Sequence, residues 1–102
     1  MKRIAISDQS GTWFDLEKSE KFAQDTWWNG QNNVSKATGC STEHEALFLT
    51  SGGKWVLNKY SQYSNQEDAY LVISEKEAVV WFLKQEMDLP KTLEGQDKDY
   101  EI

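Results

Sequence analysis

The chain has 102 residues, and its length fits a single domain near the commonest domain size. Hydrophobic residues make up 38% and aromatic residues 13%, which supplies enough apolar area for one core, while one cysteine excludes an intramolecular disulfide. The 17 acidic and 11 basic side chains give a net charge of −6 without a visible cluster of Lys or Arg, which disfavours binding to nucleic-acid phosphates.

The first third of the chain predicts a β-hairpin followed by a helix. Residues 2–14 alternate in polarity around a polar turn at 8–11, as hairpins do. Asp15 then provides an N-cap, and apolar side chains recur at helical spacing over residues 16–28. We expect this helix to end at Asn29-Gly30. Its expected core residues are Phe22, Ala23 and Trp27.

The middle of the chain predicts a long loop and a second hairpin. Residues 29–45 are polar and small and show no period, which is typical of a loop. Two apolar, aromatic-rich runs within residues 45–60 flank Gly52-Gly53, and this pattern favours a hairpin. A two-residue Gly-Gly loop would place Thr50 opposite Trp55.

The last part predicts a strand, a capped helix and a tail. Residues 69–73 form a short apolar run, and the next four, Ser74-Glu75-Lys76-Glu77, match a capping box. Pro90 stops a helix that we expect to run from 75 to about 87. Residues 89–102 are polar and acidic and lack a period, as flexible tails do. The expected core residues of the helix are Ala78, Phe82 and Leu83.

These elements predict an α+β fold in the order β-β-α-β-β-β-α. The strands come in hairpins, so the sheet should be mainly antiparallel, with two helices packed on one face. We expect residues 1–88 to form a single domain and residues 89–102 to form an acidic, flexible tail.

No pattern in the sequence points to catalysis, a metal or a cofactor. One cysteine and one histidine cannot complete a closed zinc site, and no motif around Cys40 or His44 supports a pair of nucleophile and base. Gly52-Gly53 lies between two strands, whereas a phosphate-binding loop joins a strand to a helix. No apolar run approaches the roughly 20 residues that span a bilayer. We therefore expect a cytoplasmic protein that is not an enzyme and binds no cofactor or membrane.

Two segments combine aromatic rings with amides and hydroxyls, a mixture typical of recognition surfaces. They are residues 27–33 and 60–66. Adjacent Trp27 and Trp28 diverge by about 100° on a helix, so one of them should be at least partly exposed. The candidate partner-binding residues are Trp28, Asn32, Asn33, Tyr60, Gln62, Tyr63 and Gln66.

Two motifs resemble those of a family of small bacterial proteins found in plasmid, phage and other mobile-element contexts. Glu45-Ala46-Leu47-Phe48-Leu49-Thr50 and Gly53-Lys54-Trp55-Val56-Leu57 resemble the family hairpin E-x-L-Y-x-T-x-x-G-x-W-x-L. Residues 73–83 resemble its helix motif I-x-x-S-x-x-E-A-x-x-W-L. Phe48 replaces the family Tyr, and Tyr60–Gln66 replaces a Gly-rich segment. Over residues 2–84, the resemblance implies a stand-alone accessory protein that binds and inhibits something.

We therefore expect a small, non-enzymatic module, encoded on a mobile element, that binds another protein. Two alternatives stay open. The first is an acidic inhibitor of a nucleic-acid-directed host defence or toxin protein. The second is a domain that binds a small molecule or a carbohydrate through Trp27 or Trp28, because indole rings also stack on sugars.

Overall fold

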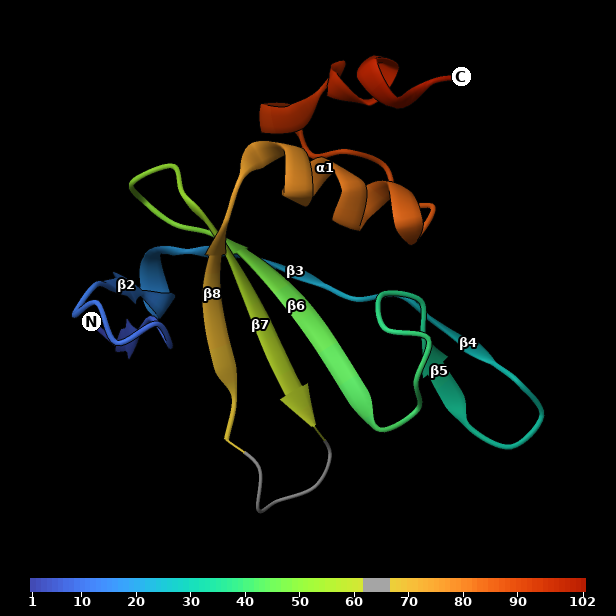
Figure 1. Ribbon diagram of the computed structural model, residues 1–102, viewed down its shortest axis with the longest axis horizontal. Helices are drawn as coiled ribbons and strands as arrows, with labels where there is room; N and C mark the ends of the chain where they lie inside the picture. The colour runs from blue at the N-terminus through green and yellow to red at the C-terminus, as the bar shows by residue number, and fades with distance from the viewer. Residues whose placement is uncertain (62–66) are drawn as a thin grey trace.

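The computed structural model describes residues 1–61 and 67–102 and has a mixed α+β, mainly antiparallel architecture (Figure 1). Its described part contains one α-helix, α1 (Glu75–Lys84), and three 3-10 segments, η1 (Leu16–Lys18), η2 (Lys91–Leu93) and η3 (Gln96–Tyr100). The strands are β1 (Arg3–Ala5), β2 (Trp13–Asp15), β3 (Glu20–Ala23), β4 (Thr26–Trp28), β5 (Asn33–Ser35), β6 (Glu43–Leu49), β7 (Trp55–Ser61) and β8 (Ala69–Ile73).

A four-stranded antiparallel sheet of order β3-β6-β7-β8 forms the centre of the molecule. Helix α1 lies across the upper part of this sheet in Figure 1, and the two-stranded β1–β2 sheet lies to its left. Successive side chains of a strand point to opposite faces. On β6, Leu47 accordingly packs in the cluster formed with α1, while Ala46 and Phe48 pack with residues of the first hairpin. The sheet therefore has an apolar core on each face.

The core beneath α1 is built around aromatic rings. The Phe82 ring meets those of Phe22 and Trp81 edge to face, with centroids 5.3 and 5.1 Å apart. The Trp55 ring completes the group at 6.1 Å from Phe82. Pairs of this geometry contribute about 0.5–1.5 kcal/mol each beyond the burial of their area. They fix the helix to the sheet at β3 and β7.

The second core ties the beginning of the chain to its last strand. The Phe14 ring lies 5.7 Å from Phe48 and 5.9 Å from Tyr70. The backbone N–H of Ser7 donates to the carbonyl of Tyr70 at 2.8 Å, and the Ser7 hydroxyl accepts from the Tyr70 N–H at 2.9 Å. These bonds satisfy backbone groups at the outer edge of β8, a position that otherwise invites pairing with another strand.

The helix expected over residues 16–28 is wrong. Asp15 does act as an N-cap, since its Oδ1 accepts from the Glu17 N–H, but the element that it caps is the single turn η1. Strands β3 and β4 follow, and β3 pairs with β6 from Glu20 to Ala23. Pairing with a long neighbouring strand outweighs the helical spacing, because local propensity is a weak preference that tertiary context overrides. Trp27 is half exposed and Ala23 is exposed, so only Phe22, which is half-buried, packs against the core.

The second hairpin is confirmed, with a register one residue away from the expected one. Leu49 lies opposite Trp55, and the Thr50 N–H donates to the Lys54 carbonyl at 2.9 Å. The loop therefore has three residues, and Gly53 at its end has a φ of 80°. That left-handed conformation closes three-residue hairpin loops and favours glycine.

The strand over residues 69–73 and the capped helix after it are confirmed. The Ser74 hydroxyl accepts from the Glu77 N–H at 3.2 Å, and the Glu77 carboxylate accepts from the Ser74 N–H at 3.3 Å. The helix ends at Lys84, before the expected residue 87, and the chain reverses at Glu86, whose φ is 59°. Ala78 and Phe82 are buried as expected, whereas Leu83 is exposed. Val79 is buried in its place.

The residues after Pro90 cross over α1 on the side away from the sheet (Figure 1). The Leu93 side chain is fully buried and belongs to the same core cluster as the buried residues of α1, against which Met87 and Leu89 also pack. Farther along, the Tyr100 hydroxyl donates to the Lys76 carbonyl at 3.4 Å. The segment that the sequence assigns to a flexible tail thus contributes one core side chain.

Candidate functional site

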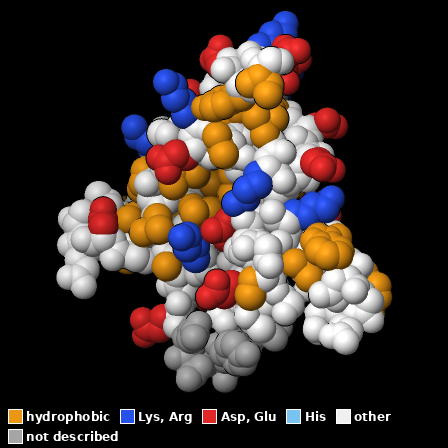
Figure 2. All heavy atoms as spheres, turned by 45° about the vertical axis from the view of Figure 1, so that its right-hand side comes forward, with side chains coloured by type: hydrophobic (Ala, Val, Ile, Leu, Met, Phe, Trp, Pro, Cys, Tyr) orange, Lys and Arg blue, Asp and Glu red, His pale blue; other side chains and the backbone are white. Residues whose placement is uncertain are grey.

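A two-stranded hairpin, formed by β4 and β5, projects from the side of the central sheet (Figures 1 and 2). We call residues 25–36 the tryptophan arm. At its tip, the Asn29 side-chain oxygen accepts from the N–H groups of Gln31 and Asn32, both at 2.9 Å. Gly30, which follows Asn29, has a φ of 102°, which glycine adopts without strain. The tip is therefore a turn held by its own side chain.

Two large rings are left open to solvent on this arm. Trp27 is 50% exposed and Trp28 is 63% exposed. They lie opposite Val34 and Asn33, and as neighbours on a strand they point to opposite faces of the ribbon. A tryptophan buries about 150–250 Å² when fully covered, so much apolar area on the arm is unused within the chain.

The base of the arm is fixed by the amide of Gln24. Its oxygen accepts from the Ser35 hydroxyl at 2.6 Å and from the Glu45 N–H at 2.9 Å. Its nitrogen must then be the donor to His44 Nδ1, 2.7 Å away. That donation assigns the neutral His44 ring the tautomer with hydrogen on Nε2. One side chain thereby links β5 of the arm to β6 of the central sheet.

A second amide, that of the buried Gln85, links the arm to α1. The Gln85 oxygen accepts from the Asp25 N–H at 2.8 Å, and the Gln85 nitrogen donates to the Trp81 carbonyl at 3.1 Å. The Lys36 ammonium lies 3.1 Å from the Asp25 carboxylate and holds the pKa of that carboxyl below its usual range. The arm is thus held at its base, where Val34 and Ser35 are buried, and is exposed over residues 26–33.

Three of the predicted partner-binding residues, Trp28, Asn32 and Asn33, lie together on the exposed arm. Tyr60 lies on β7 of the central sheet, where its ring lies 5.4 Å from that of His44. The structure therefore does not place Tyr60 on the arm. Gln62, Tyr63 and Gln66 lie outside the described residues.

The sequence predicts Trp27 as a core residue, whereas the structure places it half exposed on the arm. A usable signal is present: Asn29-Gly30 is a strong hairpin sequence, and residues 26–28 and 33–35 are short strand-like runs on either side. A helix over residues 16–28 makes Asn29-Gly30 a helix end instead. The strand β5 within the expected loop of residues 29–45 was missed for the same reason.

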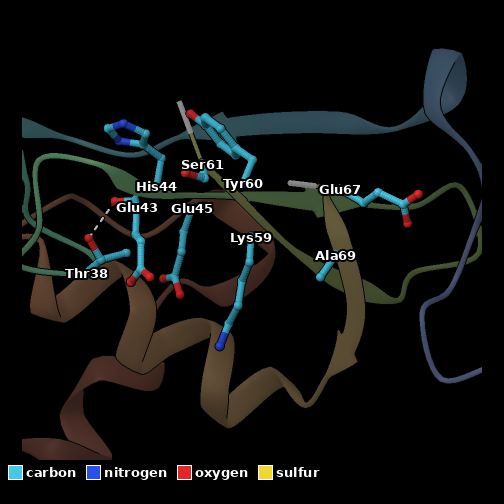
Figure 3. A pocket seen from close by; sticks show the side chains of 9 residues that line it. All are labelled: Thr38, Glu43, His44, Glu45, Lys59, Tyr60, Ser61, Glu67 and Ala69. Carbon is cyan, nitrogen blue, oxygen red and sulfur yellow. Dashed lines mark hydrogen bonds between the residues drawn. The ribbon is translucent and has the colours of Figure 1, made fainter. Parts of the chain in front are cut away.

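A hollow of about 480 Å³ lies at the end of the central sheet that α1 does not cover (Figure 3). In Figure 3, the side chains of Glu43, Glu45 and Lys59 extend to one side of the sheet, and those of His44 and Tyr60 extend to the other. The Thr38 hydroxyl donates to the Glu43 carbonyl at 2.7 Å. The remaining lining residues are Ser61, Glu67 and Ala69.

Cys40 and His44 hydrogen-bond to different partners. The Cys40 sulfur lies 3.2 Å from the Thr42 hydroxyl, and this bond is the main cause that lowers the pKa of the Cys40 thiol. His44 bonds to Gln24, as described above. Within residues 1–61 and 67–102, no three His, Cys, Asp or Glu side chains are grouped to hold a metal ion.

Comparison with protein-family models, with curated proteins and with solved structures finds no match. The resemblance to the small bacterial family therefore stays a prediction. In the described part of the chain, no helix is long and apolar enough to cross a membrane.

Proposed function

We propose that this chain is a small protein-binding module whose contact surface is the tryptophan arm. The observation that carries the proposal is the exposure of Trp27 and Trp28 on a hairpin that projects from the sheet. The proposal includes three predictions from the sequence: the module acts in the cytoplasm, it is not an enzyme, and it is encoded on a mobile element.

Tryptophan is enriched among the residues that dominate binding energy at protein interfaces. Its rigid ring loses little conformational entropy on binding and gains from the area it covers. Asn32 and Asn33 lie next to the rings and offer amides for the polar rim that such interfaces have. Because Gln24 and Gln85 already order the base of the arm, less ordering remains for the binding step.

The test compares proteins captured from a host lysate by the tagged chain and by single variants. We expect Trp28→Ala to lose a partner that the parent chain retains, with a loss of about 2 kcal/mol or more, the threshold for a dominant interface residue. The matched control is Trp13→Ala. Trp13 is also 50% exposed but lies on β2, where the Arg3 guanidinium lies 4.9 Å from its ring. A partner retained equally by all three proteins would contradict the proposal.

The carbohydrate alternative makes a different prediction for the same ring. A sugar stacks on one face of an indole and needs no protein partner. If Trp28→Ala abolishes stabilisation of the purified chain by a glycan, while the lysate captures show no difference between parent and variant, the arm is a carbohydrate site and the protein-binding proposal is wrong.

A further inference from the structure

An apolar groove of about 340 Å³ runs along the side of α1, between the helix and the strands β7 and β8. Leu57 and Ile73 form its floor, and both are half-buried. Val80 on the helix is 45% exposed and lines the groove together with Tyr100. Figure 2 shows hydrophobic side chains open to solvent here, with charged side chains around them.

The helix side of the groove has a regular pattern. Lys76, Val80 and Lys84 are spaced four residues apart, so they form one stripe along α1. The next stripe holds Glu77 and Trp81. The Glu77 carboxylate accepts a hydrogen bond from the Ser74 N–H in the capping box, so it is already engaged at the start of the helix.

The groove and the hollow of Figure 3 are neighbours, because Glu45 lines both. Glu43 and Glu45 are alternate residues of β6 and extend to the same side of the sheet, whereas Glu67, which also lines the hollow, points away from them. The Trp81 indole N–H donates to Glu45 at 3.1 Å, which orients this carboxylate without neutralising it. Lys59 is the one lysine of the hollow, and no Lys or Arg ammonium or guanidinium among the described residues lies within 4.0 Å of these three carboxylates.

We propose that the groove and the hollow together bind a peptide segment that carries a basic side chain next to an aliphatic one. The aliphatic side chain would cover Leu57, Ile73 and Val80, and the basic group would reach Glu43 and Glu45. Charge complementarity selects this occupant. The hollow is lined by three glutamates and one lysine, whereas the two lysines of the groove, Lys76 and Lys84, lie on α1, and the whole chain carries −6, which attracts cationic partners.

The arrangement also sets the direction of the segment. The lysines of the groove come from α1, whereas the carboxylates come from β6 and from the residues before β8. The basic side chain of the peptide therefore lies toward the uncovered end of the sheet, and the neighbouring aliphatic side chain lies toward the helix. This surface is separate from the tryptophan arm, so it goes beyond the function proposed above.

The test uses the purified full chain and a fluorescein-labelled hexapeptide of alternating leucine and lysine. We expect saturable binding of this peptide. Replacing its leucines by serine should weaken the binding about tenfold or more, because the burial of the leucine side chains is lost. A matched leucine–glutamate peptide should not bind. Glu43→Gln and Glu45→Gln should each weaken binding about two- to fivefold, as for a partly exposed ion pair.

Val80→Ala should also weaken binding. Two controls should leave it unchanged: Glu20→Gln, which neutralises an exposed carboxylate on the far edge strand β3, and Trp28→Ala, which alters the arm. The readout that locates the peptide is NMR, in which the Trp81 indole N–H signal should move and the Trp28 signal should not.

Several results would overturn the proposal. Absence of binding at millimolar peptide is one, and equal binding of the serine–lysine peptide or of spermidine is another, because either would show a response to charge alone. Self-association of the chain that shifts the same signals would assign the groove to a second copy instead. Since the arm variant is among the controls, failure here leaves the arm proposal standing.

Discussion

One oxygen of Asp15 joins the start of the chain to the first turn. Its Oδ1 accepts from the N–H groups of Lys2 and Glu17, both at 3.1 Å. The bond from Lys2 is the main cause, and with the bond from Glu17 it holds the pKa of the Asp15 carboxyl below its usual range. The bonds favour the ionised form, so they link the stability of the first hairpin to pH.

The sign of this linkage gives a prediction. Because the pKa of Asp15 is lower in the native chain than in the unfolded one, its contribution is complete above about pH 4. It is lost as the pH falls through the lower native value. We expect Asp15→Asn to be less stable than the parent at pH 7 and to approach it as the pH falls through the native pKa of Asp15. Urea denaturation over this range measures the difference, and a constant gap at every pH would contradict it.

Cys40 gives a second prediction at this scale. The Thr42 hydroxyl is the main group that lowers the pKa of the thiol, so it raises the fraction of thiolate at neutral pH. Thr42→Val keeps the shape of the side chain and removes the bond. We expect slower alkylation of Cys40 by iodoacetamide at pH 7, with Ser41→Ala as the matched control. Equal rates for parent and Thr42→Val would show that the bond has no influence.

At the scale of elements, the cap of α1 illustrates what local sequence can specify. Ser74 and Glu77 satisfy each other's backbone groups whatever the rest of the chain does, and the expected helix forms there. We expect Ser74→Ala to lower the free energy of unfolding by about 0.5–2 kcal/mol. Chemical denaturation measures this change. Asp88, exposed beyond the helix, provides a surface control in Asp88→Ala.

At the other end of α1, the Gln85 side chain forms a hydrogen bond to a residue far away in the sequence. Its buried amide accepts from the Asp25 N–H, 60 residues away in the sequence. We expect Gln85→Leu to cost about 1–3 kcal/mol, because the partly buried Asp25 N–H loses its hydrogen-bond acceptor. Hydrogen exchange at Asp25 should accelerate as well. Unchanged exchange there would mean that another acceptor replaces the amide.

Ser74 and Gln85, the caps of α1, show why some elements are predictable from sequence and others are not. The second hairpin and α1 are specified by neighbours in sequence, namely a Gly-Gly turn and a capping box. Strand β3 is specified by its pairing with β6, more than 20 residues later, and no local pattern contains that information. Its residues, with a lysine and a serine near Phe22, also fit a helical spacing, so the pattern favoured the wrong element.

The candidate site follows the same rule. Trp28, Asn32 and Asn33 were predictable as exposed residues, because an aromatic pair beside an Asn-Gly turn cannot be buried on both sides. The orientation of the arm was not, because Gln24 and Gln85 set it through distant partners. The groove beside α1 likewise depends on how the helix crosses the sheet.

For the molecule as a whole, Leu93 connects the C-terminal segment to the core. Its side chain is 0% exposed. We expect Leu93→Ala to cost about 2–5 kcal/mol, the usual range for removing a buried leucine side chain. Truncation after Asp88 should cost at least as much, since it also removes Leu89. The control is truncation after Gly95, which retains both leucines. Thermal denaturation distinguishes these proteins, and a stable chain ending at Asp88 would contradict the burial of Leu93.

The position of Leu93 has a consequence for synthesis on the ribosome. The core beneath α1 collects side chains from Phe22 to Leu93, so it spans nearly the whole sequence. The ribosome adds about 5–20 residues per second, and domains generally fold as units. The nascent chain must therefore leave Phe22 and Trp55 uncovered while the helix and Leu93 are still being made and extruded. During those seconds, the exposed second hairpin is a target for chaperones and a hazard for aggregation.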